Sequence, residues 1–119
     1  MTTRDDVTAF NRAFEAALAA QDVDAVVASY TDDARLLFEG SPMIQGSVAI
    51  EATLGPGLRK RPTTITFESL DVLDGGSFVV DVGTFKTPTG TGKYVVVHER
   101  QPDGSLRMKI DSGTGDSAE

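Results

Sequence analysis

With 119 residues, the chain is long enough for one domain with a single core and too short for two. It has no cysteine, which excludes disulfide scaffolds, cysteine nucleophiles and thiolate metal sites. Eighteen acidic residues against eleven basic ones give a formal charge of −7. This charge repels a phosphate backbone and argues against nucleic acid as a partner.

The N-terminal segment lacks the pattern of a signal peptide, and no window reaches the roughly 20 apolar residues of a membrane span. We therefore expect a cytoplasmic protein with no membrane partner. One domain is expected over residues 1–119, with residues 113–119 as a frayed tail.

The first 60 residues predict three helices and one strand. Apolar side chains recur at three- and four-residue spacing from Thr3 to Ala20, which is typical of an amphipathic helix. A short second helix is expected from Asp22, a capping residue, to Tyr30. Residues 34–38 read as a strand and residues 47–58 as a third helix, which Pro56 shortens or kinks.

The second half of the chain predicts a sheet. Turn sequences rich in glycine and proline separate runs of β-branched and aromatic residues, so neighbouring strands are expected to be antiparallel. The four expected strands are residues 63–72, 77–87, 92–101 and 105–112.

Two short motifs stand at fixed places in this order of elements. The sequence YTDDA (residues 30–34) ends the second helix, and GSVAI (residues 46–50) opens the third. On these grounds nearly the whole chain resembles the SnoaL-like branch of the nuclear transport factor 2-like superfamily. The resemblance implies an α+β, cystatin-like fold in which a cone-shaped, curved antiparallel sheet wraps around three N-terminal helices. It also implies an internal pocket and a homodimer through the last strands.

Asp111 is the first candidate for chemistry, because relatives resembling this chain place a polar pocket residue near the end of the last strand. A carboxyl in an apolar cavity has a raised pKa and can exchange protons near neutral pH. Strict alternation instead places Asp111 on a solvated face with Arg107 and Lys109, and a bulge would reverse this. Both alternatives stay open at this point.

Two enzyme groups of the superfamily invite comparison, and neither is matched completely. Asp81 and Asp111 resemble the paired aspartates of limonene epoxide hydrolases, but Val79 stands where those enzymes have an arginine. In the comparison with ketosteroid isomerases, Phe38 stands nearest to the general base and Val97 near the second carboxylate. The reaction therefore stays open, because one fold serves many functions.

Other polar candidates are His98, Tyr94 and Tyr30. His98, the only histidine, shares a strand face with Tyr94 and is either a pocket acid or base or a packing or dimer-surface residue. Tyr30 either points its hydroxyl to the pocket mouth or belongs to the core. Phe38, Met43 and Phe67 are apolar enough to line a cavity or to fill a core.

The pattern therefore predicts binding of a small hydrophobic or ring-containing molecule, with possible acid/base isomerase, cyclase or hydrolase activity. Asp111, His98 and Tyr30 are the expected catalytic residues, and Phe38, Met43, Phe67, Asp81 and Tyr94 the expected ligand-binding residues. No metal or cofactor is expected, because the carboxylates lack a convincing ligand spacing. The alternative is a non-enzymatic association module with a vestigial pocket.

Overall fold

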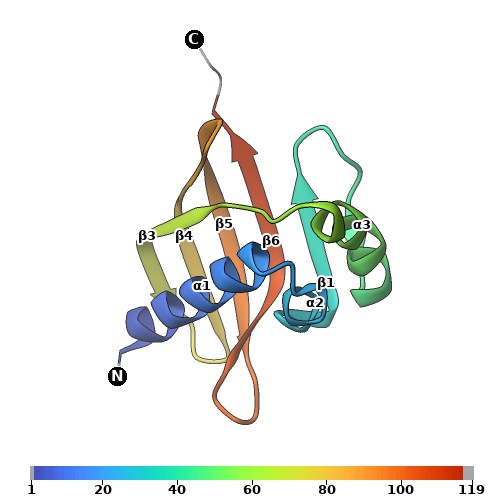
Figure 1. The fold of residues 1–119 in the computed structure, drawn as a ribbon. Helices are drawn as coiled ribbons and strands as arrows, with labels where there is room; N and C mark the ends of the chain where they lie inside the picture. The colour runs from blue at the N-terminus through green and yellow to red at the C-terminus, as the bar shows by residue number, and fades with distance from the viewer. Residues whose placement is uncertain (1, 117–119) are drawn as a thin grey trace.

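Three helices and six strands make up residues 2–116, the part of the chain that the computed structural model describes (Figure 1). In chain order they are α1 (Thr3–Ala19), α2 (Val23–Ala28), β1 (Tyr30–Phe38), β2 (Ile44–Gln45), α3 (Ser47–Lys60), β3 (Thr66–Asp74), β4 (Phe78–Thr87), β5 (Gly90–Arg100) and β6 (Leu106–Gly115). None of these helices is long and apolar enough to cross a membrane.

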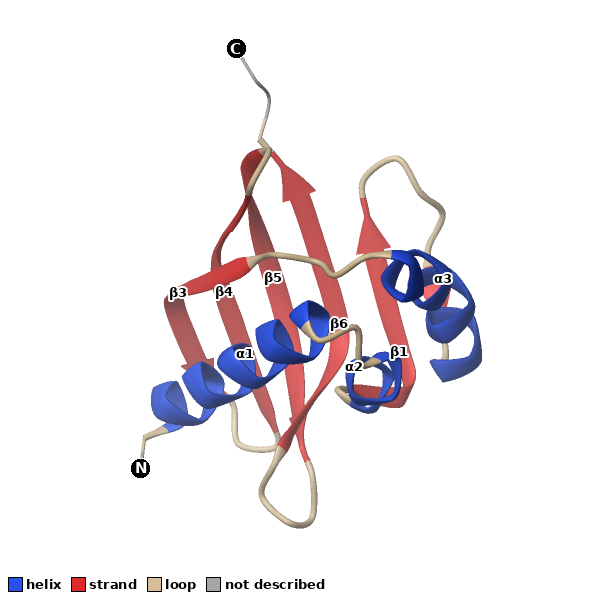
Figure 2. Cartoon of the chain, in the orientation of Figure 1, coloured by secondary structure: helices blue, strands red, loops and turns tan. Residues whose placement is uncertain are grey.

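The strands form one curved, open sheet in the order β2-β1-β6-β5-β4-β3, and the helices lie on one side of it (Figure 2). This confirms the predicted α+β fold. Consecutive strands from β3 to β6 are antiparallel, as their short turns require. The pairing of β1 with β6 is parallel, which the turn signals could not predict because these strands are far apart in the chain.

Several element boundaries differ from the sequence-based prediction. The first strand begins at Tyr30, so this residue opens β1 and does not end a helix. Helix α3 continues through Pro56 to Lys60. Strand β6 continues to Gly115, with Gly113 paired to both Phe38 and Tyr94. The expected frayed end at residues 113–115 is therefore wrong, and residues 117–119 lie outside the described part of the chain.

Helix α1 crosses the concave face of the sheet and begins with a capping box. The Thr2 hydroxyl accepts a hydrogen bond from the Asp5 backbone N–H, and the Asp5 carboxylate accepts one from the Thr2 N–H. The buried side of the helix contains Val7, Asn11 and Phe14. Asn11 is a polar residue in an otherwise apolar stripe, and its partners are described below.

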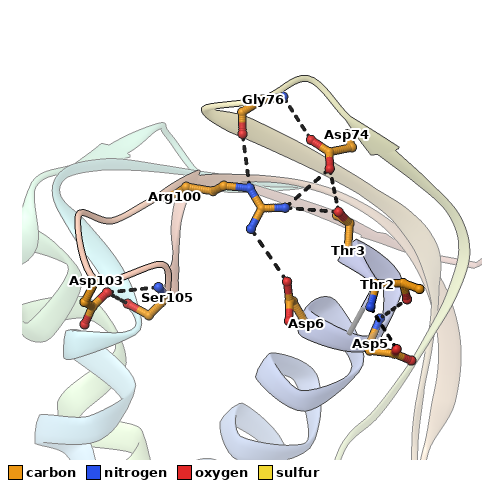
Figure 3. A network of polar contacts seen from close by, with 9 residues as sticks. All are labelled: Thr2, Thr3, Asp5, Asp6, Asp74, Gly76, Arg100, Asp103 and Ser105. Carbon is orange, nitrogen blue, oxygen red and sulfur yellow. Dashed lines mark hydrogen bonds and ion pairs between the residues drawn. The ribbon is translucent and has the colours of Figure 1, made fainter.

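Arg100 of β5 ties the first turn of α1 to the turn between β3 and β4 (Figure 3). Its guanidinium donates to the Gly76 carbonyl and the Thr3 hydroxyl, both at 3.1 Å. It also forms ion pairs with Asp74 at 3.4 Å and Asp6 at 3.6 Å. These contacts hold one end of α1 in place over the sheet.

Candidate ligand-binding cavity

A cavity of about 370 Å³ lies between α1 and the concave face of the sheet. Its walls are mostly apolar and include three aromatic rings that come from separate strands: Phe38, Phe67 and Phe85. Phe10, Phe14 and Leu18 of α1 form the opposite wall. The volume is within the range of small-molecule sites, which spans roughly 300–1,000 Å³.

Asp111 reaches this cavity because β6 contains a bulge. The register shifts so that Met108 pairs with His98 while Ile110 pairs with Val97, which leaves Lys109 as the extra residue. After the bulge, Asp111 returns to the face that Met108 occupies, and it lines the cavity with Met108. Strict alternation, which predicted a solvated face, fails at this point.

The Asp111 carboxyl is paired with a buried phenol. Tyr30 Oη donates to Asp111 Oδ2 at 2.7 Å. Burial raises the pKa of Asp111 to about 6, although the hydrogen bond from Tyr30 acts in the opposite direction. Burial and the neighbouring carboxylate also raise the pKa of Tyr30 well above its usual value. Asp111 therefore exchanges its proton near neutral pH, while Tyr30 keeps its own.

A second phenol–carboxylate pair lies on the neighbouring strands. Tyr94 Oη donates to Asp81 Oδ2 at 2.9 Å, and Asn11 Nδ2 donates to the same oxygen at 3.3 Å. Burial raises the pKa of Tyr94, and Asp81 adds to this, whereas Ser69 and Asn11 act in the opposite direction as hydrogen-bond donors. Tyr94 and Asn11 line the cavity, whereas Asp81 has an exposed fraction of 0% and does not line it, so its prediction as a ligand-binding residue is wrong.

His98 lies deeper in the core than the sequence predicted. Its ring packs edge-on against Phe10, with ring centroids 4.6 Å apart, and it is absent from the cavity wall. Neither ring nitrogen has a hydrogen-bond partner among the described residues. Burial lowers the pKa of His98 to about 4, although the Asp81 charge acts in the opposite direction. The expectation of an accessible acid or base is wrong, because α1 covers this part of β5.

The remaining predicted residues divide into two groups. Tyr30, Phe38, Phe67 and Tyr94 line the cavity. Met43 does not: it lies in the loop before β2 and is 54% exposed, so its prediction as a lining residue is wrong. The loop follows the end of β1 and leaves the concave face.

Sequence reasoning missed the part that Asn11 plays in this wall. A signal was present, because Asn11 follows Val7 by four residues and precedes Phe14 by three on the apolar stripe of α1. A polar side chain at such a position is buried only where it finds hydrogen-bond partners.

Two glycines make room for aromatic side chains on the floor of the cavity. A Cβ at Gly83 would lie 2.6 Å from Tyr94 Oη and 2.2 Å from the Glu68 carbonyl oxygen. A Cβ at Gly92 would lie 2.1 Å from the Phe85 ring. The rings of Tyr94 and Phe85 therefore pack directly against the backbone of these glycines, which fixes their positions.

Comparison with known proteins gives the family. The profile of the SnoaL-like domain matches residues 10–107. The chain belongs to the SnoaL-like domain family. A search of curated protein sequences gave no significant match.

Solved structures of this SnoaL-like domain's relatives share its nuclear transport factor 2-like fold at low identity. A ketosteroid isomerase-like protein of Erwinia carotovora atroseptica is 19% identical, with 92% of this chain and 93% of that one covered and a TM-score of 0.71. A protein of Novosphingobium aromaticivorans with a cystatin-like fold is 13% identical, with coverage of 98% and 83% and a TM-score of 0.78. A protein of Thiobacillus denitrificans described as a calcium/calmodulin-dependent protein kinase type II association domain is 15% identical, with coverage of 92% and 94% and a TM-score of 0.77.

The SnoaL-like domain offers acid/base chemistry and little for a metal to bind. Within residues 2–116, no group of three or more histidine, aspartate or glutamate side chains is placed to hold a metal ion. The polar groups of the cavity wall are carboxyl, phenol, amide and, at Thr63, hydroxyl groups.

Proposed function

We propose that this SnoaL-like domain binds a small, ring-containing apolar molecule in the cavity and transfers a proton on it. The observation that carries the proposal is the Asp111 carboxyl, which has a pKa of about 6 and lies in a mostly apolar wall. A general base or acid is most effective when its pKa is close to the working pH. Asp111 is the proposed proton carrier.

Tyr30 is the proposed positioning residue for this step. It is almost fully buried and donates its hydrogen bond to one carboxylate oxygen, which leaves the other oxygen for the ligand. The ionised Asp111 removes a proton from a carbon next to a ligand carbonyl and returns it to another carbon. The carboxylate is thereby regenerated, and the reaction needs no oxidant or reductant.

A thermal-shift screen tests this proposal. Wild type and Asp111→Asn are heated at pH 7 with small ring lactones, enones, epoxides and steroids, because a ligand that binds only the folded state raises the melting temperature. We expect an enone or lactone to stabilise the wild type, and the wild type alone to exchange the ligand's acidic proton for deuterium. Stabilisation by no ligand, or equal proton exchange in the variant, would contradict the proposal.

We also propose that two copies of the chain pair through the face of the sheet opposite to the helices (Figure 2). Leu73, Val80, Val97 and Ile110 form one apolar row across β3 to β6. Val95 beside this row is 43% exposed. In a chain of charge −7, an apolar row without charged side chains is a place where two copies can approach with little repulsion.

This interface supports the second candidate function, a non-enzymatic association module. Light scattering should give a dimer for the wild type and a monomer for Val95→Lys. Val48→Lys is the control, because Val48 is 86% exposed on α3, which lies on the other side of the sheet (Figure 2). A monomeric wild type would refute the interface. A dimer that binds none of the ligands would favour the association module over the enzyme.

A further inference from the structure

We propose that the cavity has a second polar end, formed by Tyr94 and Asn11, that binds a hydrogen-bond donor on the ligand. The ligand class is then an apolar ring compound with a hydroxyl or N–H group at the end away from Asp111. This inference rests on the proposed function, because it names the ligand of the same cavity. It goes beyond proton transfer, because it concerns which molecules are selected.

The two polar ends are arranged on either side of one apolar residue. Val96 of β5 pairs with Asp81 on β4 and with Asp111 on β6, so the three residues form one row across the sheet. Neighbouring strands are about 4.8 Å apart, which places the Cα atoms of the two aspartates about 10 Å from each other. A ligand that lies over Val96 can therefore reach the Asp111 carboxyl at one end and, at the other, the Tyr94 and Asn11 side chains that cover Asp81.

The hydrogen atoms at the second end are already engaged. The single hydroxyl proton of Tyr94 points to Asp81. Asn11 Nδ2 donates to Asp81 Oδ2 and to Ser69 Oγ, both at 3.3 Å. Because a carboxylate can only accept, the amide nitrogen must face Asp81, and the amide oxygen of Asn11 is left for another donor.

The groups that remain for a ligand are therefore acceptors: the amide oxygen of Asn11, and beside it the phenol oxygen of Tyr94, which Ser69 and Asn11 also approach as donors. Asn11 and Tyr94 both line the cavity. A ligand carbonyl placed there would meet two acceptors and no free hydrogen, whereas a hydroxyl or N–H would complete the network. This chemistry selects a donor.

The acceptors are held in place before a ligand arrives. Asp81 is wholly buried beneath them, and the absence of a side chain at Gly83 allows the Tyr94 hydroxyl to approach the backbone. Asn11 is only 6% exposed and is fixed by its two hydrogen bonds. Preorganised groups lose little conformational freedom on binding, so a hydrogen bond to them contributes more to the affinity than one to a mobile group.

Matched ligand pairs test the inference. The probes are bicyclic enones with and without a ring hydroxyl at the end opposite to the carbonyl, and the dissociation constants are measured by calorimetry for wild type, Tyr94→Phe and Asn11→Leu. Tyr94→Phe keeps the ring and removes the oxygen. We expect wild type to bind the hydroxylated member about tenfold more tightly, as one well-placed hydrogen bond allows, and each variant to bind both members within about twofold.

Tyr30→Phe is the matched control, because it removes a phenol oxygen from the other end. It should weaken both members of a pair equally and keep the preference for the hydroxyl. Equal binding of both members by wild type would overturn the inference and leave the proposed function in place. A preference that survives in Tyr94→Phe and Asn11→Leu would also overturn it. Binding of neither member by wild type would overturn the inference together with the proposed function.

The comparison of the paired ligands in wild type needs no variant, so it decides the inference even where a variant fails to fold. A network that only fastens α1 to the sheet would lower the melting temperature of both variants and leave the ratio of the two dissociation constants unchanged. The ratio therefore separates a selecting role from a structural one.

Discussion

Replacing Asp111 by asparagine should make the folded protein more stable above pH 6. The substitution preserves the shape of the side chain and an oxygen that accepts the hydrogen bond of Tyr30. It removes a negative charge that the folded state holds unfavourably, since burial raises the pKa of Asp111 from 3.8 to about 6. The cost of this charge to stability should therefore disappear in the variant.

The sign and the pH window follow from the direction of the shift. Below pH 3.8 the carboxyl is protonated in both the folded and the unfolded state, and the two proteins should differ little. As the pH rises from 3.8 to 6, the unfolded state loses its proton first, and the wild type loses stability relative to Asp111→Asn. At 1.36 kcal/mol for each pH unit, the loss reaches about 3 kcal/mol as a ceiling.

Urea denaturation at one-unit steps from pH 4 to pH 8 measures this difference. The free energy of unfolding of Asp111→Asn should exceed that of wild type by about 1–3 kcal/mol at pH 7 and by little at pH 4. Asp116→Asn is the control, because hydrogen bonds from Lys93 and Thr91 lower the pKa of Asp116, and its removal should not stabilise the protein. An advantage of Asp111→Asn that is absent at pH 7, or the same at every pH, would refute the reasoning.

Two further predictions concern the core beside the cavity. The ring protons of His98 should show no titration by NMR between pH 8 and pH 5, because burial lowers its pKa to about 4, and a midpoint near 6.5 would show an accessible ring. The contribution of His98 to stability should fall as the pH drops below 6.5, where the unfolded state takes up a proton first, and it is measured in Asp111→Asn, which lacks the opposing contribution of Asp111. Gly83→Ala should lower the free energy of unfolding by about 2 kcal/mol, since its Cβ would meet the Glu68 carbonyl and the Tyr94 hydroxyl. Gly90→Ala is its control, because no atom lies within 4 Å of that Cβ, and equal melting temperatures of the two variants would contradict the prediction.

The fold was largely predictable because its signals are local. The apolar stripe of α1, the capping residues and the turn at residues 74–76 depend on neighbours within a few positions. The boundaries were less predictable where distant strands stabilise a segment. Gly113 and Gly115 carry little intrinsic strand preference, but pairing with β5 extends β6 over them.

The residues of the candidate site could be predicted from the sequence, but their pairing in space could not. The sequence pointed to Asp111, Tyr30 and Tyr94 but offered no means to pair each phenol with its carboxylate. The Tyr30–Asp111 hydrogen bond joins residues 81 positions apart, and the Tyr94–Asp81 hydrogen bond joins residues on neighbouring strands. Such contacts depend on register, which the alternation of a single strand does not reveal.

The class of fold, the lack of thiol chemistry and the small set of side chains that can transfer a proton all follow from the amino-acid sequence. Which of these side chains face the cavity depends on how the strands and helices pack. One extra residue at Lys109 turns Asp111 inward, and the passage of α1 over β5 covers His98. The physical reason is that side chains alternate between the two faces of a strand, so a shift of one residue exchanges solvent for cavity.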